Sequence, residues 1–506
     1  MNNSPIQSII PANYQPKNMA AAFEQFTQAY PTYAETEAID QLRATDYSRL
    51  DEQKHIYLDY TGGGLYAESQ IQQHMTMLSQ NVFGNPHSNN PTSVAMTNLV
   101  EGARKYVLEY FNASPDEYIA IFTPNASGAL KLVGESYPFQ ADGRFLLAFD
   151  NHNSVNGIRE FARTKGATVD YVPLTMPNLR IDQPELDKLL TQADPAHGNL
   201  FAYPAQSNFS GVQHPLELID RARDKGWDVL VDCAAFAPTN RLDIGRWLPD
   251  YATFSFYKMF GFPTGIGCLL ARKSALQKLN RPWFAGGTIT LASTQGQWHH
   301  LAQGEAGFED GTVDYLNIPG VKTGLQHLEA IDIDTIHERV TCLSGWLLQN
   351  LYGLRHQNGK PLVRVYGPTD LEMRGGTVTV NFYDPSGNLL DYRRVEELAN
   401  EQNISIRTGC FCNPGANEIA EALTEEDIAP GFEEGKRIGL PVFMSLLEHS
   451  TGKSAGAVRI SVGLASNFAD VYQFLNFAQG FLDKSSEKVG HVTFEIENCR
   501  VIRDGS

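Results

Sequence analysis

The chain has 506 residues and carries 40 Lys or Arg against 58 Asp or Glu, so its formal net charge is -18 at pH 7. Because nucleic-acid binding depends largely on clustered basic side chains, this balance argues against a nucleic-acid partner. Nowhere does an uninterrupted apolar stretch approach the roughly 18 residues that a membrane-spanning helix needs, so we expect no membrane attachment.

Cysteine usage indicates a reducing compartment. Six cysteines are scattered along the chain without the spacing of a disulfide framework, and no secretory segment follows the polar start Met1-Asn2-Asn3-Ser4. We therefore expect a soluble, cytoplasmic protein.

Three regions follow one another in the hydrophobic pattern. Residues 1–45 are predicted to form an N-terminal arm. Residues 46–310 alternate short apolar runs with amphipathic stretches, which predicts a large α/β domain with a mostly parallel sheet and helices on both faces. Its expected strands are Tyr118–Phe122, Phe145–Ala148, Val169–Val172, Leu200–Tyr203, Val229–Val231 and Gly267–Ala271. Residues 311–506 are predicted to form a smaller α+β domain, with a helix at Val321–Ile331 and strands at Leu362–Tyr366, Thr377–Phe382 and Val458–Val462.

Lys258 and Asp232 suggest a cofactor. Lys258 stands in the glycine-rich segment Ser255-Phe256-Tyr257-Lys258-Met259-Phe260-Gly261, directly after a strand-like run. Asp232 ends the apolar strand at Val229–Val231, at the edge where open α/β sheets bind ligands. A lysine amine and an aspartate beside a pyridine nitrogen are the two protein groups that pyridoxal phosphate needs. Asp232 could instead cap the next helix.

The segment Thr123-Pro124-Asn125-Ala126-Ser127-Gly128 joins a predicted strand to a predicted helix. Free amide groups and the helix dipole at such a junction attract phosphate, and the short side chains of Asn125 and Ser127 can add hydrogen bonds. An ordinary capped helix has the same pattern, so that reading stays open.

His152 and Asn208 each follow a predicted strand and so belong to the same rim of strand ends. The imidazole could stack on a flat aromatic cofactor, and the amide could bond to a ring hydroxyl. Each could also be purely structural, the asparagine in a turn.

Two cysteines are separated by a single residue in Cys410-Phe411-Cys412-Asn413-Pro414-Gly415. An exposed thiolate on a flexible turn can attack a cofactor-bound substrate. A metal site, a disulfide or an inert pair are the alternatives, although one C-x-C without a second ligand pair is weak evidence for zinc.

Five motifs together resemble the class V aminotransferase family, and in particular its cysteine desulfurase-type members. They are Tyr57-Leu58-Asp59-Tyr60-Thr61-Gly62-Gly63-Gly64, Gly84-Asn85-Pro86-His87-Ser88, Asp150-Asn151-His152-Asn153-Ser154-Val155, Ser255–Gly261 and Arg407-Thr408-Gly409-Cys410-Phe411-Cys412-Asn413. Within that family the chain is similar, from about residue 50 to 485, to the N-terminal domain of molybdenum cofactor sulfurases. The resemblance implies the fold-type I architecture of pyridoxal phosphate enzymes and, for the desulfurase-type members, a persulfide formed from L-cysteine.

The resemblance also implies a role for each site residue. Lys258 would bind the cofactor covalently, Asp232 would pair with its ring nitrogen, His152 would stack on the ring and Asn208 would contact a ring oxygen. The phosphate would be held by Asn125, Ala126, Ser127 and Ser255. Thr288, in the turn Gly286-Gly287-Thr288, would reach the phosphate of a neighbouring subunit, which implies a homodimer.

Two further residues would then select the reaction. Arg459 matches the arginine that binds the substrate α-carboxylate, unless it forms a structural ion pair. Cys412 is favoured over Cys410 as the residue that takes the sulfur. Tyr257 stands where standard cysteine desulfurases have a histidine, as in the molybdenum cofactor sulfurase group, and too few residues follow the resemblance for those sulfurases' C-terminal domain.

We therefore expect an enzyme that converts L-cysteine, or a related compound, to L-alanine and passes the sulfur through Cys412 to a protein or small-molecule acceptor. A pyridoxal phosphate-dependent C–S lyase, epimerase or aminotransferase acting on a tailored amino acid is the alternative. A catalytically silent, partner-binding module is a third possibility. No metal is expected at the site.

Overall fold

A seven-stranded sheet forms the centre of the large lobe in the computed structural model, which describes residues 14–86, 88–432, 443, 447, 450–495 and 500–502. Strand β10 runs antiparallel to both of its neighbours, and the other adjacent strands are parallel. The predicted α/β class with a mostly parallel sheet is confirmed. In sheet order the strands are β2 (Tyr118–Thr123), β10 (Gly267–Arg272), β9 (Tyr251–Ser255), β8 (Asp228–Asp232), β7 (Asn199–Pro204), β3 (Arg144–Ala148) and β4 (Thr168–Val172).

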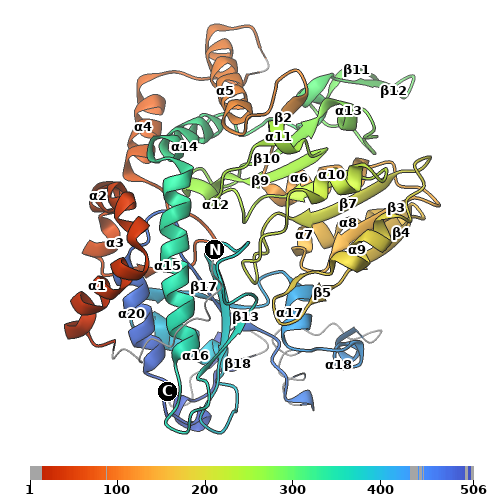
Figure 1. Ribbon diagram of the computed structural model, residues 1–506. Coiled ribbons are helices and arrows are strands. Elements are labelled where there is room, and N and C mark those ends of the chain that lie inside the picture. The colour runs from red at the N-terminus through yellow and green to blue at the C-terminus, as the bar shows by residue number, and fades with distance from the viewer. Residues whose placement is uncertain are drawn as a thin grey trace.

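Both faces of this sheet are buried, which explains why its strands read as short apolar runs. On one face, α6 (Ala126–Ser136) and α8 (Ile158–Thr164) cover side chains such as Leu147 and Leu200. On the opposite face, the alternate side chains, such as Leu146 and Phe201, join a larger core. That face is covered by α5 (Pro91–Tyr110), α9 (Gln183–Leu190) and α10 (Leu218–Arg223). The sheet therefore forms a layer between two layers of helices (Figure 1).

The smaller lobe is built on a four-stranded antiparallel sheet in the order β13, β14, β17, β16. Its strands are β13 (Val363–Tyr366), β14 (Thr377–Phe382), β17 (Ala457–Ser461) and β16 (Arg407–Gly409). Helices α14 (Ile318–Ile331) and α15 (Ile333–Gly353) run from the large lobe along the small one (Figure 1). The short strand β1 (Ile56–Tyr57) pairs in parallel with β15 (Ile404–Ser405), which ties the start of the main fold to this lobe.

The N-terminal arm packs against the smaller lobe. Its helices α1 (Met19–Ala29) and α2 (Glu37–Asp46) lie beside α15 and α20 (Phe468–Gln479) in Figure 1. The fully buried Phe26 meets Trp346 and Phe468 with ring centroids 5.7 and 4.9 Å away. Residues 1–13 lie outside the described part of the chain, and the domain boundaries at 45 and 310 stay predictions.

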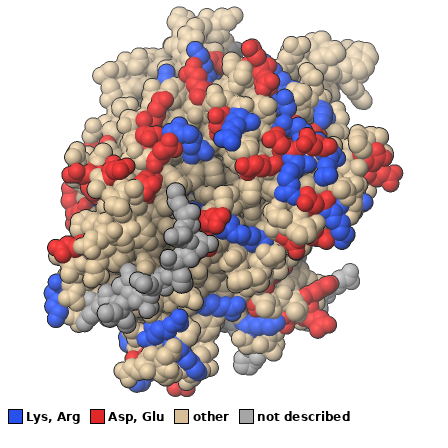
Figure 2. Space-filling view, in the orientation of Figure 1, with Lys and Arg blue, Asp and Glu red and all other residues tan. Residues whose placement is uncertain are grey.

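Charged side chains of both signs are interspersed over the face seen in Figure 2. Many form surface ion pairs, for example Arg144 with Asp170 and Lys188 with Glu185, both at 2.8 Å. Among the helices that the structure describes, we find none long and apolar enough to cross a membrane.

Candidate active site

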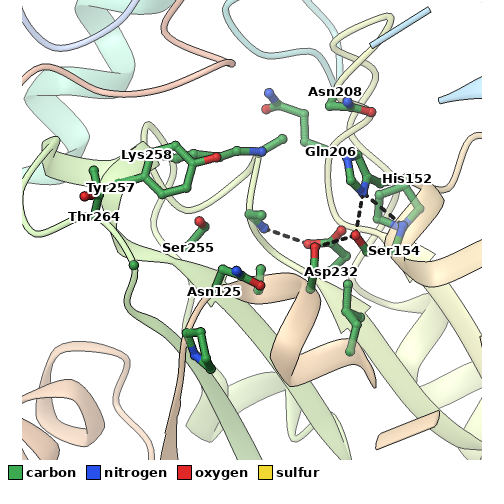
Figure 3. A pocket seen from close by; sticks show the side chains of 18 residues that line it. Asn125, His152, Ser154, Gln206, Asn208, Asp232, Ser255, Tyr257, Lys258 and Thr264 are labelled. Carbon is green, nitrogen blue, oxygen red and sulfur yellow. Dashed lines mark hydrogen bonds between the residues drawn. The ribbon is translucent and has the colours of Figure 1, made fainter. Parts of the chain in front are cut away.

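A cavity of about 380 Å³ opens where the carboxyl ends of β7 and β8 meet the start of α6. Figure 3 shows Lys258 and Tyr257 on one side of it and His152 with Ser154 on the other. Eight of the residues singled out in the sequence line this cavity, and they come from five separate segments of the chain. They are Asn125, Ala126, Ser127, His152, Asn208, Asp232, Ser255 and Lys258.

Lys258 lies in the short helix α12 (Phe256–Phe260), directly after β9. The glycines around it allow two backbone segments to approach closely. A Cβ atom on Gly64 would lie 2.8 Å from the carbonyl oxygen of Lys258, and one on Gly261, whose φ is 76°, would lie 2.2 Å from the amide nitrogen of Tyr66. Burial lowers the pKa of Lys258, although the nearby Asp232 carboxylate opposes this shift. A deprotonated amine is the form that reacts with a carbonyl.

Asp232 is the last residue of β8 and is buried. Its Oδ1 accepts a hydrogen bond of 3.0 Å from the backbone N–H of Ala234, which closes a turn. The next helix, α11 (Ile244–Trp247), has Asp243 as its N-cap, so the capping alternative for Asp232 is wrong. Asp232 also lines the cavity, and a carboxylate there can face a cationic ligand group.

His152 occupies the N-cap of α7 (Asn153–Asn156). Its Nδ1 accepts a hydrogen bond of 3.1 Å from the backbone N–H of Ser154, which places the proton of the neutral ring on Nε2. Burial lowers the pKa of His152, while the Asp232 carboxylate opposes this shift. Burial therefore favours the neutral form of the imidazole.

Ser154 also lines the cavity, although the sequence pattern predicted no role for it. Its Oγ lies 3.1 Å from Nδ1 of His152 and 2.5 Å from Oγ of Ser127, so it links the ring to the start of α6. The only sequence signal was its position two residues after a histidine that caps a helix, a pattern with many structural explanations.

The start of α6 has the character of an anion site. Asn125 is the N-cap, and its Oδ1 accepts a hydrogen bond of 2.9 Å from the N–H of Gly128. Its side chain thus caps the helix, as the structural alternative predicted. The first-turn N–H groups of Ala126 and Ser127 remain at the cavity, where the dipole of an eleven-residue helix favours an anion.

The cysteine loop lies against the rim of this cavity. The amide of Asn208 donates to the carbonyl of Phe411 at 2.8 Å, and the N–H of Asn153 donates to the carbonyl of Cys412 at 2.7 Å. The amide of Asn413 donates to Oδ1 of Asn208 at 2.9 Å. Phe411 and Cys412 adopt positive φ angles of 56° and 55°, which β-carbon-bearing residues rarely do. The Asn208 side chain thus holds the loop, and its predicted contact with a cofactor stays a prediction.

The two cysteines of this loop differ in exposure. Cys412 is exposed and Cys410 is partly buried, and burial raises the pKa of the Cys410 thiol. Neither side chain lines the cavity itself.

Arg459 does not itself line the cavity. It is 3 % exposed, its Nη2 donates to Oδ1 of Asp59 at 2.9 Å, and its Nη1 donates to the carbonyl of Asn208 at 3.1 Å. Its guanidinium carbon is 4.7 Å from the centre of the Phe411 ring. The ion-pair alternative therefore holds in this structure, and the pair adjoins the site.

Thr288 does not line the cavity of its own chain. Its hydroxyl accepts from the N–H of Ala285 at 2.8 Å and donates to the carbonyl of that residue at 2.9 Å, which closes the turn. Its contact with the phosphate of a neighbouring subunit stays a prediction.

Comparison with known proteins places these motifs in context. The sequence profile described as "Aminotransferase class-V" matches residues 56–474. Molybdenum cofactor sulfurase of Solanum lycopersicum is 35% identical over 496 residues, which are 91% of this chain and 60% of that protein. The human molybdenum cofactor sulfurase is 34% identical over 461 residues, 87% of this chain and 51% of that protein. The chain thus spans between half and two thirds of these relatives.

Solved structures agree on the fold. A cysteine desulfurase from Thermococcus onnurineus NA1, in its apo form, superposes with a TM-score of 0.70 at 23% identity, covering 88% of this chain and 98% of that one. The cysteine desulfurase CsdA from Escherichia coli gives a TM-score of 0.66 at 20% identity, covering 88% and 99%. The predicted fold-type I architecture is confirmed. With a profile match over most of its length, the chain belongs to the class V aminotransferase family, whose enzymes depend on pyridoxal phosphate.

Proposed function

We propose that the protein is a cysteine desulfurase or sulfurtransferase that converts L-cysteine to L-alanine and leaves the sulfur on Cys412 as a persulfide. The observation that carries this proposal is the pinned cysteine loop, in which Asn208 and Asn153 hold the backbone carbonyls of Phe411 and Cys412 at the rim of the cavity. The backbone of Cys412, whose side chain is exposed, is thereby fixed beside the site.

The residues at the cavity fit pyridoxal phosphate. Its volume of about 380 Å³ lies in the usual range for small-ligand sites, roughly 300–1,000 Å³. The N–H groups at the start of α6, together with Ser255, would hold the phosphate, and Asp232 would face the ring nitrogen. His152 would lie against the ring, and the second amide proton of Asn208 is available for a ring oxygen. When bound, the cofactor supplies an electron sink that stabilises negative charge on the substrate carbon beside the amino group.

The side chains of this chain would then carry out the proton and sulfur transfers. Lys258 would hold the cofactor and, once the substrate amine has replaced it, its neutral Nζ would accept the proton from the substrate α-carbon. Sγ of Cys412 would attack the substrate sulfur, so that one S–S bond forms and the C–S bond breaks. The β-carbon gains a proton in place of sulfur, which balances the one that the Cys412 thiol gives up, and Lys258 would return a proton to the α-carbon. The products are L-alanine and a Cys412 persulfide.

The decisive experiment is to incubate the cofactor-loaded protein with L-cysteine and to measure alanine, cyanolysable sulfur and the mass of the Cys412 peptide. We expect alanine to form and the peptide to gain one sulfur atom. Cys412→Ala is expected to abolish persulfide formation, whereas the matched variant Cys410→Ala keeps it. Pyruvate and ammonia as products, or an undiminished rate in Cys412→Ala, would instead indicate the lyase.

We also propose a homodimer and a reducing compartment. The hairpin formed by β11 (Ile289–Ser293) and β12 (Trp298–Leu301) follows the Thr288 turn and exposes two large apolar side chains, Leu291 at 64% and Trp298 at 74%. Such side chains support a surface that another subunit covers.

The five described cysteines are unpaired, which supports cytoplasmic localisation. The sulfur acceptor is left as a class, a protein or a small thiophilic molecule that reaches Cys412.

A further inference from the structure

Asp59 lies between two arginines that come from neighbouring strands of the small lobe. Its Oδ1 accepts the 2.9 Å hydrogen bond from Nη2 of Arg459, on β17. Its Oδ2 accepts from Nε and Nη2 of Arg407, on β16, at 2.9 and 2.6 Å. The two arginines pair across the antiparallel strands. One buried carboxylate thus serves two guanidinium groups, and the three groups together keep one net positive charge.

Arg459 depends on this carboxylate. Burial lowers the pKa of Arg459, and Asp59 opposes this shift most strongly. Among the residues that the structure describes, Asp59 is the one acid that forms an ion pair with Arg459, and Nε of Arg459 is buried without a hydrogen-bond partner. A buried guanidinium without a counter-ion is unfavourable, so Asp59 determines where Arg459 can lie.

The backbone of Asp59 also joins this pair to the lysine turn. Its carbonyl accepts from the N–H groups of Gly62 and Gly63 at 2.9 and 3.1 Å, and the N–H of Gly64 donates to the carbonyl of Tyr257 at 3.0 Å. A Cβ atom on Gly62 would lie 2.4 Å from Oδ2 of Asp59, so the side chain packs flat against this turn. The position of Arg459 is thereby fixed relative to the segment that carries Lys258.

We propose that Asp59 is a positioning residue for the α-carboxylate of the substrate. It holds Arg459 under Phe411 and against the backbone carbonyl of Asn208, a residue that lines the cavity, while Arg407 fixes Asp59 from the solvent side. The single net positive charge of the three groups matches one carboxylate. This inference depends on the proposed function in one respect, namely that an amino-acid substrate binds through Arg459.

The test measures binding without turnover. The cofactor-loaded protein is titrated with L-alanine and with ethylamine, which lacks the carboxylate, and the change in cofactor absorbance gives each Kd. Losing hydrogen bonds between charged groups is expected to raise the Kd for L-alanine by about 10- to 100-fold in Asp59→Asn. The Kd for ethylamine is expected to stay the same, which a general structural defect would not produce.

A matched control is Asp470→Asn, since Asp470 is likewise buried and pairs with a buried arginine, Arg43, and neither residue lines the cavity. We expect it to lower stability and to leave both Kd values unchanged. If Asp59→Asn does not fold, Arg407→Met carries the test, with an expected rise in the L-alanine Kd of about 3- to 10-fold. Unchanged or tighter L-alanine binding in the folded variant would overturn the proposal. A parent protein that binds L-alanine but forms none from L-cysteine would contradict the desulfurase reaction alone.

Discussion

Burial sets the charge of several side chains at the site. It lowers the pKa values of Lys258 and His152, which favours a neutral amine and a neutral ring, and it raises that of Cys410, which favours the protonated thiol. A protonated, partly buried thiol is a poor nucleophile. Of the two loop cysteines, the exposed Cys412 is therefore the better candidate for sulfur transfer, as the family resemblance also implied.

Glu421, just after the helix that follows the cysteine loop, is a second case of burial acting on charge. Burial raises its pKa to about 7, against hydrogen bonds to Oε1 from the hydroxyl of Tyr366 at 2.6 Å and the amide of Asn381 at 2.8 Å. The folded state therefore binds this proton more tightly than the unfolded state. Its contribution to stability is fully present below about pH 4.5 and is lost as the pH rises through about 7.

Replacing Glu421 by Gln removes this titration and keeps an oxygen for both donors. We expect the stability of Glu421→Gln relative to the parent to increase between pH 5 and pH 8, by about 1–3 kcal/mol. Chemical denaturation at the two pH values measures the difference. Glu24→Gln, which makes the same change at an exposed position, is the control. A difference that does not change with pH would contradict the assignment of a raised pKa to Glu421.

At the scale of elements, the cysteine loop is a fixed connection between β16 and α17 (Pro414–Ala420). Asn413 holds its end in two ways. Its Oδ1 caps α17 by accepting from the N–H of Ala416 at 3.1 Å, and its amide donates to the carbonyl of Asp150 at 2.7 Å as well as to Asn208. In the proposed reaction, a loop held like this would position its thiol at little entropic cost.

Asn413→Ala is therefore expected to affect catalysis as well as stability. Losing the helix cap should cost about 1 kcal/mol, and freeing the loop should lower the rate of persulfide formation by roughly 10-fold or more. The matched control is Asn467→Ala, which removes the cap of α20, where Oδ1 accepts from the N–H of Asp470 at 3.0 Å. Single-turnover kinetics with L-cysteine and thermal unfolding distinguish the two effects. Equal rates in both variants would show that the loop needs no anchor.

The local sequence pattern predicted the strands that are buried on both faces, because each of them is a short apolar run. The bounds of strands β2, β3, β7, β8 and β10 agree with the prediction to within a residue or two. The positions of Asp232 and His152 at strand ends predicted that both lie at one rim of the sheet, and both line the cavity. Asp59 and Ser154 received no role, because their partners are set by tertiary contacts. The pair of Asp59 with Arg459 joins residues 400 positions apart, and no local spacing signals such a contact.

At the scale of the whole molecule, the site is assembled from both lobes. The large lobe provides the cavity and the N–H of Asn153, and the small lobe provides the cysteine loop and Arg459. Strand β1, near the start of the main fold, pairs with β15 of the small lobe and leads directly to Asp59. A change in how the lobes pack would therefore move the cysteine loop and Arg459 together.

The proposed dimer depends on an exposed apolar surface of the large lobe. Leu291 and Trp298 lie on the hairpin that follows the Thr288 turn, and burying each such side chain contributes about 1.5–3 kcal/mol. Placing charges there, in Leu291→Glu/Trp298→Glu, should convert the dimer to monomers and weaken retention of pyridoxal phosphate, because the turn would no longer reach the other subunit. Light scattering at micromolar concentrations and absorbance after dialysis measure the two effects. Tyr352→Glu, at a 49% exposed aromatic side chain on α15, should change neither. A parent protein that is monomeric, or a double variant that stays dimeric with full cofactor, would contradict this assembly.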